Sequence, residues 1–363
     1  MKARIAVLGG DGIGPEVTAQ AQRALEAVAA RFGHDFEFKE GLLGGIAYDK
    51  TGDAYPPETN DLCLSTDATL FGAVGGPKWD PLPRDDKPER GLLRLRAAMD
   101  VFANLRVVKP RPIVRDASPV KPEILEGVDM IVLRELLGGA YFGKPSEQRG
   151  EPGNREAVDT TFYTEEQIRR IVRLAFEMAR DRRKKVTSVD KQNVMSTSRL
   201  WRQVAEEVGR DFPDVALEHV LVDSMSMYMI ARPASFDIVV AENLFGDILT
   251  DEAAVLTGSL GMMPSASLGD VATVGRRGLY EPIHGSAPDI AGKNIANPCG
   301  AILSAALLLR YSLSLHEEAD CIERAVDAVL LSGGRTADLA RSGETVLGTR
   351  EMGDLIAQAI ATA

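Results

Sequence analysis

The chain has few cysteines and no long hydrophobic run. Cys63, Cys299 and Cys321 are odd in number, widely spaced and not arranged as CxxC pairs. This pattern argues against a disulfide framework or a structural zinc site, and it suits buried thiols in a reducing compartment. The longest apolar runs, such as residues 301–309, fall well short of the ~20 residues that span a bilayer. We therefore expect no membrane association.

The sequence also lacks a surplus of basic residues, since its formal net charge is −11. This charge argues against broad binding to nucleic acid or to anionic membranes, although a local arginine pocket for a small anion remains compatible with it. No cleavable signal precedes the first apolar segment, so we expect a cytoplasmic protein. With 363 residues, the chain exceeds the ~250–300 residues at which a single core stops growing, and two domains are expected.

What is present is an alternation of strand-like runs and helical periodicity, which predicts an α/β architecture. Strands are expected at residues 5–8, 69–74, 130–133, 186–189 and 237–241. Helices are expected at residues 15–32, 165–183, 200–208, 300–315 and 322–331. Segment 147–159 is polar and aperiodic, which predicts a loop or an exposed arm.

Asp247 and Asp251 lie four positions apart in the apolar sequence NLFGDILTDE. On an α-helix, this spacing places both carboxylates on one face, one turn apart. Two close negative charges among apolar neighbours are costly unless a cation or basic groups lie between them. Oxygen ligands of this kind suit Mg²⁺ or Mn²⁺, whereas an exposed acidic helix face is the alternative.

Three arginines, Arg96, Arg106 and Arg134, lie in the motifs GLLRLR, NLR and RELLGGAYFGKP. A guanidinium group binds a carboxylate through two parallel hydrogen bonds, so three converging arginines would suit a di- or tricarboxylate substrate. Taken singly, each arginine is also compatible with an ordinary surface position. Leu92 and Leu93, beside Arg96, would give such a pocket an apolar wall.

Tyr141 lies in the same segment as Arg134, and Lys191 follows the predicted strand at 186–189. Lysine and tyrosine can act as general base and general acid, and α/β proteins place their sites at the carboxyl ends of strands. Asp223 is a third candidate metal carboxylate. A solvated lysine and a packed tyrosine are the alternative interpretations.

Two glycine-rich segments complete the set of candidate loops. GGDGIGPE, residues 9–16, joins the first strand to a helix and could expose backbone N–H groups to an anion, or could simply be a tight turn. Its spacing is GxGxG rather than the GxGxxG of dinucleotide-binding Rossmann folds. Residues 281–298 are rich in glycine, proline and small polar residues, and loops of this length are usually functional.

Motifs along nearly the whole chain resemble those of the isocitrate/isopropylmalate dehydrogenase family of β-decarboxylating hydroxyacid dehydrogenases. The motifs are GDGIGPE, GAVGGPKWD, PERGLLRLR, FANLR, LRELLGGAYFG, SVDKQNV, SRLWR, NLFGDILTDE, GSLGMMPSASLG and EPIHGSAPDIAGKNIANP. The resemblance implies a two-domain α/β fold that is not a Rossmann fold. Residues 1–101 and 258–363 would form the cofactor-side domain. Residues 102–257 would form the substrate, metal and dimerisation domain, with the 147–159 arm reaching towards a partner subunit.

The resemblance also implies a role for each candidate residue. The residues expected to contact the substrate are Arg96, Arg106, Arg134, Asp223, Leu92, Leu93 and Glu89. Asp223, Asp247 and Asp251 would hold Mg²⁺ or Mn²⁺, with Lys191 as base and Tyr141 as acid. The residues expected to contact NAD are Gly75, Gly76, Glu89, His284, Gly285, Ser286, Ala287, Asp289 and Asn297. In this family the lysine and the first aspartate come from the neighbouring subunit of a homodimer.

The implied reaction oxidises a C2 hydroxyl with hydride transfer to NAD⁺ and then releases the C3 carboxylate as CO₂. Asp289 lies where NADP-linked isocitrate enzymes carry a lysine, and a carboxylate there favours NAD⁺. Leu92 and Leu93 replace polar residues that bind a third carboxylate, which favours 3-isopropylmalate, a substrate of leucine biosynthesis, over isocitrate.

Three other functions remain as alternatives. A relative acting on malate or tartrate would carry much the same residues, because methylene groups are weakly discriminated. A catalytically silent regulatory subunit usually lacks a catalytic residue, and none is missing here. A metal-dependent phosphatase or prenyl-type enzyme would explain Asp247 and Asp251 but would leave Lys191 and Asp289 without a role.

Overall fold

The structure is a computed structural model that describes residues 1–272 and 274–362. The chain folds into two compact units. Unit 1 comprises Met1–Val101, Pro110–Pro119 and Thr257–Ala363, and unit 2 comprises Phe102–Lys109 and Val120–Leu256. Among the described residues, no helix combines the length and the apolar character needed to cross a membrane.

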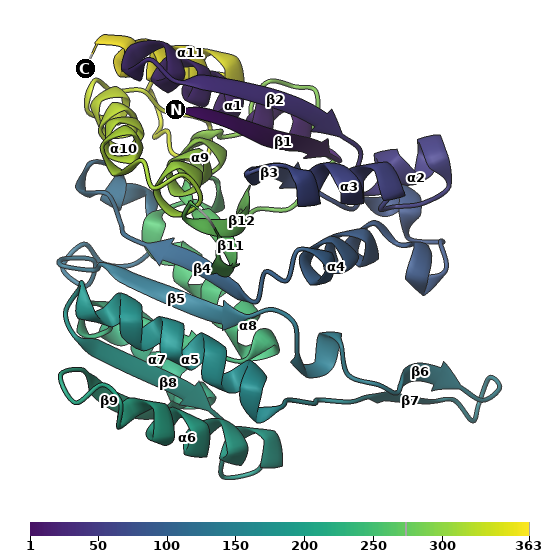
Figure 1. The fold of residues 1–363 in the computed structure, drawn as a ribbon. Coiled ribbons are helices and arrows are strands. Elements are labelled where there is room, and N and C mark those ends of the chain that lie inside the picture. The colour runs from purple at the N-terminus through teal and green to yellow at the C-terminus, as the bar shows by residue number, and fades with distance from the viewer. Residues whose placement is uncertain (273, 363) are drawn as a thin grey trace. The chain divides into compact units, whose positions relative to one another are not determined.

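Unit 1 is built on strands in the order β2-β1-β3-β12-β11, parallel except for the antiparallel pair β11 and β12. The strands are β1 (Lys2–Gly10), β2 (Asp35–Gly41), β3 (Ala68–Ala73), β11 (Pro264–Val271) and β12 (Arg276–Pro282). The helices are α1 (Gly14–Phe32), α2 (Gly45–Thr51), α3 (Pro57–Ser65), α4 (Pro88–Ala98), α9 (Cys299–Tyr311), α10 (His316–Leu331) and α11 (Thr349–Thr362). Helix α9 is apolar on all sides because it packs between α1, α10 and the strands β11 and β12 (Figure 1).

Unit 2 is built on strands in the order β4-β5-β10-β8-β9. Strand β4 runs antiparallel to β5, and the remaining neighbours are parallel. The strands are β4 (Ala103–Val108), β5 (Met130–Glu135), β8 (Lys185–Asp190), β9 (Ala216–Leu221) and β10 (Ile238–Ala241), and the helices are α5 (Glu165–Arg180), α6 (Ser196–Gly209), α7 (Val222–Ala231) and α8 (Asn243–Ala254). Strands β5 and β10 are parallel neighbours, so the loops that follow them leave the same edge of the sheet. The candidate site begins at this edge.

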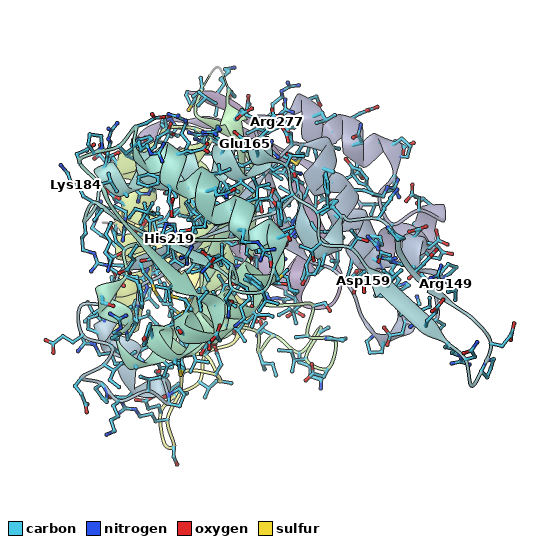
Figure 2. The ribbon with its side chains drawn as sticks, turned by 90° about the horizontal axis from the view of Figure 1, so that it is seen from below. Arg149, Asp159, Glu165, Lys184, His219 and Arg277 are labelled. Carbon is cyan, nitrogen blue, oxygen red and sulfur yellow. The ribbon has the colours of Figure 1, made fainter. Side chains whose placement is uncertain are left out.

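The polar segment at 147–159 forms an exposed hairpin of β6 (Ser146–Arg149) and β7 (Glu156–Asp159). Figures 1 and 2 show it extending away from the sheet of unit 2, with Arg149 and Asp159 labelled along it. Its strands carry polar side chains on both faces, so period-2 patterning gives no signal for them. The prediction of an exposed arm is confirmed, and the arm is more regular than a loop.

The prediction of an α/β fold is confirmed. Several boundaries differ from expectation by a few residues, and α9 ends at Tyr311 rather than at residue 315. Helix α10 begins at His316, six positions before the predicted start, because its first turn carries Glu317 and Glu318. Acidic residues there favour the helix N-terminus without contributing to apolar periodicity. Residues 110–119, which lie within the range predicted for the second domain, belong to unit 1. Arg111 pairs with Asp327 of α10, and Arg335 Nη2 donates to the carbonyl oxygen of Ile113 at 3.1 Å.

Short 3₁₀ turns connect many of these elements. They are Pro77–Trp79, Arg84–Asp86, Pro112–Ala117, Gly139–Tyr141, Pro233–Ser235, Val255–Thr257 and Leu260–Met262. The turn at Gly139–Tyr141 carries a candidate catalytic residue, and the turns at 77–79 and 84–86 border the pocket described below.

Candidate functional site

Helix α8 carries both aspartates of the NLFGDILTDE motif. The chain leaves β10 and enters the helix at Glu242, whose carboxylate accepts a hydrogen bond from the Phe245 N–H at 2.9 Å. Asp247 and Asp251 then lie one turn apart on α8, as the spacing predicts. The Asp247 side chain is 31% exposed and that of Asp251 is 66% exposed, so both carboxylates are open to solvent.

Two buried arginines face these aspartates from the adjacent strands β4 and β5. Arg106 Nη1 lies 3.0 Å from Asp251 Oδ1 and its Nη2 lies 3.4 Å from Asp247 Oδ1. Arg134 pairs with Asp247 through its Nη1. In the β4–β5 register, Arg106 lies opposite Val132, which places Arg106 and Arg134 on the same sheet face. The repulsion between the two carboxylates is thus offset by two guanidinium groups.

Tyr141 completes this cluster from the turn after β5. Its hydroxyl donates to Asp247 Oδ2 at 2.9 Å, and the Arg134 guanidinium lies over its ring, 5.5 Å from the centroid. Burial, and then the negative charge of Asp247, raise the pKa of Tyr141 to about 12. The phenol is therefore protonated at neutral pH and can donate a proton.

Lys191 and Asp223 form a second pair within unit 2. Lys191 follows β8 and Asp223 lies in the first turn of α7, where the two side chains make an ion pair. The hydrogen bond from Lys191 lowers the pKa of the Asp223 carboxyl. The described residues contain no group of three or more His, Cys, Asp or Glu side chains suited to a metal ion. One chain therefore brings Asp247 and Asp251 together without Asp223.

In the GGDGIGPE segment of unit 1, the backbone N–H groups of Asp11, Ile13 and Gly14 donate to backbone carbonyl oxygens of the chain and are not left open to an anion. The Asp11 carboxylate accepts N–H groups from neighbouring loops. Its Oδ2 takes hydrogen bonds from Gly45 and Gly75, each at 2.8 Å, and its Oδ1 takes one from Ile46 at 2.8 Å. A side chain at Gly12 would collide with the Ser286 carbonyl oxygen, since a Cβ there would lie 1.9 Å from it. The segment is therefore a tight turn. It is hydrogen-bonded to the loop at Gly75 through Asp11 and to the loop at Ser286 through the N–H of Ile13.

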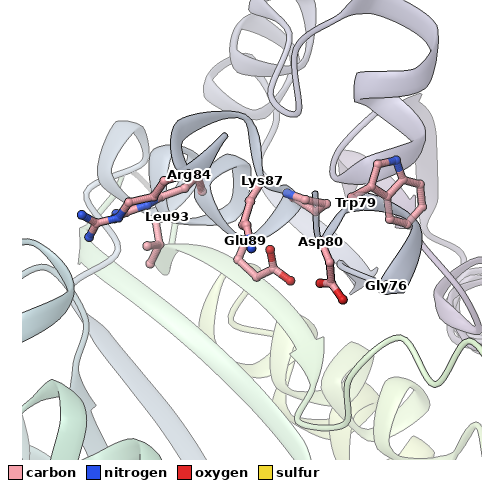
Figure 3. Close-up of a pocket in the computed structure, with 9 residues that line it drawn as sticks. Gly76, Trp79, Asp80, Arg84, Lys87, Glu89 and Leu93 are labelled. Atoms are coloured by element: carbon pink, nitrogen blue, oxygen red, sulfur yellow. The ribbon is translucent and has the colours of Figure 1, made fainter. Parts of the chain in front are cut away.

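Glu89 of α4 lies against the backbone of Gly75. Gly75 has a φ of +99°, and a Cβ there would lie 2.5 Å from Glu89 Oε1, so this close approach requires glycine. Glu89, Gly76 and Leu93 line a pocket of about 270 Å³, drawn in Figure 3. Leu92, in contrast, packs partly against the apolar core of unit 1.

The remaining predicted residues of unit 1 lie on α4 and on the segment that follows β12. Arg96 makes a buried ion pair with Glu281, the side chains being 11% and 8% exposed. Asp289 is exposed, whereas Ser286 and Asn297 are buried. Asn297 donates to Asp338 Oδ2 at 2.9 Å and accepts from the Cys299 N–H at 3.0 Å, which fixes the end of this segment. His284 Nδ1 lies 2.9 Å from the carbonyl oxygen of Gly285, which is exposed. Ala287 has a positive φ of +38°.

Comparison with known proteins identifies the family. The model of the isocitrate/isopropylmalate dehydrogenase family matches residues 4–356. The chain belongs to this family. It is 56% identical over 360 residues to the 3-isopropylmalate dehydrogenase of Halalkalibacterium halodurans, covering 99% of this chain and 98% of that protein. It is 54% identical over 355 residues to the 3-isopropylmalate dehydrogenase of Aquifex aeolicus, covering 98% and 96%.

Solved structures of the family have the same fold. The isocitrate dehydrogenase of Methylococcus capsulatus matches with a TM-score of 0.86 at 31% identity, covering 99% of each chain. A β-decarboxylating dehydrogenase of Thermococcus kodakarensis matches with a TM-score of 0.76 at 34% identity, covering 99% of this chain and 96% of that one. The predicted family and its non-Rossmann fold are thereby confirmed.

A divalent cation of the kind this dehydrogenase family implies fits the donor atoms on α8. Asp247 and Asp251 offer hard carboxylate oxygens one helical turn apart, and both are solvent-accessible. Mg²⁺ usually takes one or two protein carboxylates and completes its shell with water and substrate oxygens. The pair therefore suits Mg²⁺ or Mn²⁺ without a third carboxylate from the same chain.

Sequence reasoning missed a buried layer behind the α8 cluster. Glu135, Tyr163, Glu242 and Asn243 are all buried there and hydrogen-bonded to the site or to one another. A signal was available for two of them, because Glu135 and Glu242 are charged residues at the ends of apolar strands. Such residues require partners when they are buried.

Proposed function

We propose that the chain is an NAD-dependent, Mg²⁺- or Mn²⁺-dependent 3-isopropylmalate dehydrogenase of leucine biosynthesis. It would convert (2R,3S)-3-isopropylmalate and NAD⁺ to 4-methyl-2-oxopentanoate, CO₂ and NADH. The observation that carries the proposal is the cluster of Arg106, Arg134, Tyr141 and Asp247 in a chain whose relatives bear this name. It supplies positive charge for carboxylates, a protonated phenol and a cation-binding carboxylate in one place.

Each residue of the cluster has a role that follows from its chemistry. Arg106 and Arg134, together with Arg96 of unit 1, would bind the two carboxylates of the substrate. A bound divalent cation would act as a Lewis acid towards the C2 oxygen. Tyr141 would deliver its proton to C3 after CO₂ has left, which its raised pKa permits at neutral pH. Lys191 would take the proton of the C2 hydroxyl.

The choice of NAD⁺ is supported by Asp289. Its exposed carboxylate can accept hydrogen bonds from ribose hydroxyls and would repel the 2′-phosphate of NADP⁺. Gly75, Gly76 and Glu89 would contact the cofactor from the pocket side, and His284–Ala287 from the other loop.

The preference for an isopropyl group is supported by Leu93, which presents an apolar side chain to the pocket of unit 1. Isocitrate would leave its third carboxylate unpaired against this surface. Leu92 would contribute less than Leu93, because it packs partly against the core.

A homodimer with shared sites is supported by two features of unit 2. The adjacent helices α7 and α8 expose Met227 and Ile248, with exposures of 61% and 59%, and exposed apolar side chains in one region favour association. Within the described residues of one chain, Asp223 forms no metal-binding group with Asp247 and Asp251 and pairs with Lys191 instead, so a second copy would supply Lys191 and Asp223 to the same site. The β6–β7 arm would contact this second copy.

The proposal is tested by following NADH formation with purified protein, Mg²⁺ and a panel of 2-hydroxy acids. We expect the highest kcat/KM with 3-isopropylmalate and NAD⁺, and loss of activity with EDTA that added Mg²⁺ or Mn²⁺ reverses. Faster turnover of malate, tartrate, isocitrate or homoisocitrate would overturn the substrate assignment. Equal rates with NADP⁺ would overturn the role of Asp289.

A further inference from the structure

Arg134 lies at the end of β5, and Tyr141 lies just after the turn that follows this strand. One buried side chain binds both Arg134 and the backbone of that turn. This side chain is Asn243, the first residue of α8, which is fully buried. Its Oδ1 accepts hydrogen bonds from Arg134 Nε at 3.0 Å and from Arg134 Nη2 at 2.8 Å. Its Nδ2 donates to the carbonyl oxygens of Leu136 at 3.2 Å and Gly138 at 3.0 Å.

The Asn243 amide thereby uses both acceptor positions and both donors. Its orientation is dictated by chemistry, because the reversed amide would place N–H groups against the guanidinium of Arg134 and an oxygen against two carbonyls. Arg134 is held along its Nε–Nη2 edge, and its Nη1 is directed to Asp247. The same amide fixes the turn that leads into Gly139–Tyr141.

Asn243 is itself held from behind by Tyr163. The Tyr163 hydroxyl accepts the backbone N–H of Asn243 at 2.9 Å and donates to Glu242 Oε2 at 3.1 Å. Glu135 holds the other side of the turn, because its carboxylate accepts the N–H groups of Leu137 at 2.9 Å and Gly138 at 2.7 Å. Hydrogen bonds therefore hold both the backbone of Asn243 and the turn that its side chain binds.

We propose that Asn243 is a positioning residue that ties the carboxylate-binding Arg134 to the proton donor Tyr141. This inference rests on the proposed function, because it assigns those roles to Arg134 and Tyr141. It adds that one amide sets the geometry of substrate binding and proton delivery together. The amide oxygen holds Arg134 for substrate binding, and the amide nitrogen holds the turn before Tyr141 for proton delivery. A substitution that changes only one of these groups separates the two effects.

The substitution Asn243→Asp separates them. The carboxylate keeps oxygen acceptors for Arg134, but it cannot donate to Leu136 and Gly138 and instead repels their carbonyl oxygens. We expect kcat for 3-isopropylmalate to fall by about tenfold or more, while KM stays within about threefold of its original value. Asn243→Leu removes both halves, so there KM should rise as kcat falls.

Thr250→Val is the matched control on the same helix. Thr250 is fully buried and its Oγ1 accepts from Arg106 Nη1 at 2.6 Å. Valine keeps the shape and removes this partner of Arg106, together with the hydroxyl's hydrogen bonds to the carbonyl oxygens of Gly246 at 2.8 Å and Asp247 at 3.0 Å. We expect a raised KM and a kcat within about twofold of wild type, the opposite of the Asn243→Asp pattern.

A crystal structure of Asn243→Asp gives a readout that does not depend on activity. The Tyr141 hydroxyl should move beyond hydrogen-bond distance of Asp247 Oδ2, from 2.9 Å in the native chain, while Arg134 stays in place. An unchanged Tyr141 together with wild-type kcat would overturn the inference. A wild-type enzyme that is inactive on 3-isopropylmalate would overturn the proposed function instead, and the Tyr141 position would still decide the inference.

Tyr163→Phe keeps the test decisive if Asn243→Asp does not fold. It removes the acceptor for the Asn243 N–H and leaves the amide intact. We expect a smaller fall in kcat at constant KM. A rise in KM at constant kcat, or no change in either, would count against the inference.

Discussion

Glu135 is the residue whose burial has the clearest consequence for stability. It is fully buried at the end of β5, and burial raises its pKa to about 7. Hydrogen bonds from Leu137 and Gly138 and the nearby charge of Arg170 act in the opposite direction. The unfolded chain would bind that proton with a pKa near 4.5. The folded state therefore holds the proton more tightly than the unfolded state does.

We predict that Glu135 makes the protein less stable as the pH rises. Because its folded pKa is the higher one, its contribution is fully present below pH 4.5, declines between pH 4.5 and about 7, and is constant above that. The total change is on the order of 3 kcal/mol in the free energy of unfolding. Glu135→Gln should flatten this dependence, measured by urea unfolding at pH 5 and pH 8.

Glu166→Gln is the control for that measurement, since Glu166 is an exposed glutamate in the first turn of α5. It should leave the difference between the two pH values unchanged. If Glu135→Gln preserves the full difference as well, the buried carboxyl is not its source.

Tyr141→Phe tests the proton donor at the same scale. Removing the hydroxyl should lower kcat by about 10²–10⁴-fold, the usual contribution of a positioned acid, with KM changed only a few-fold. Because its pKa is raised to about 12, Tyr141 should cause no loss of activity on the alkaline side between pH 7 and 10. The measurement is the pH profile of kcat. A fully active Tyr141→Phe enzyme would remove Tyr141 from the mechanism.

Among the elements, helix α5 has the best-defined start. Thr164 Oγ1 accepts the Gln167 N–H at 3.2 Å, and the Gln167 side chain accepts the Thr164 N–H at 3.0 Å, which forms a capping box. Thr164→Ala should lower the free energy of unfolding by about 1 kcal/mol, measured by urea denaturation. Thr164→Ser keeps the oxygen and should cost much less. Equal losses in both variants would mean that the methyl group, not the cap, matters.

Elements with a local signal could be predicted from the sequence, and elements without one could not. Helix α1 carries Pro15 in its first turn and ends before Gly33, and its apolar stripe is continuous, so its bounds follow from the residues. Strand β12 pairs with β3, some 200 positions earlier in the chain, and nothing local to β12 indicates that partner. The charged strands of the β6–β7 arm carry no periodicity either.

The same limit applies to the site. Asp247 and Asp251 share a helix face, so their proximity is a property of spacing. Asn243, Tyr163 and Glu135 come from three separate parts of the chain and meet only after the sheet of unit 2 has formed. Tyr163 accepts the backbone N–H of Asn243, and the side chains of Asn243 and Glu135 both bind the backbone of Gly138. No short stretch of sequence encodes that arrangement.

At the scale of the whole molecule, the central question is whether each site draws on two chains. If Lys191 and Asp223 serve the Asp251 site of the partner, a heterodimer of Lys191→Ala and Asp251→Asn chains contains one intact site and one doubly altered site. Each homodimer contains none. Random exchange makes half of the dimers heterodimers, so about a quarter of wild-type activity should return.

The matched control is a mixture of Lys191→Ala with Asp223→Asn chains. Both substitutions lie on the same donated pair, so every site in that heterodimer lacks one of its members and no activity should return. Subunit exchange is verified by native mass spectrometry in both mixtures. Recovery only in the first mixture requires that the α8 aspartates of one chain work with the Lys191–Asp223 pair of another. If neither mixture regains activity after verified exchange, each complete site belongs to a single chain.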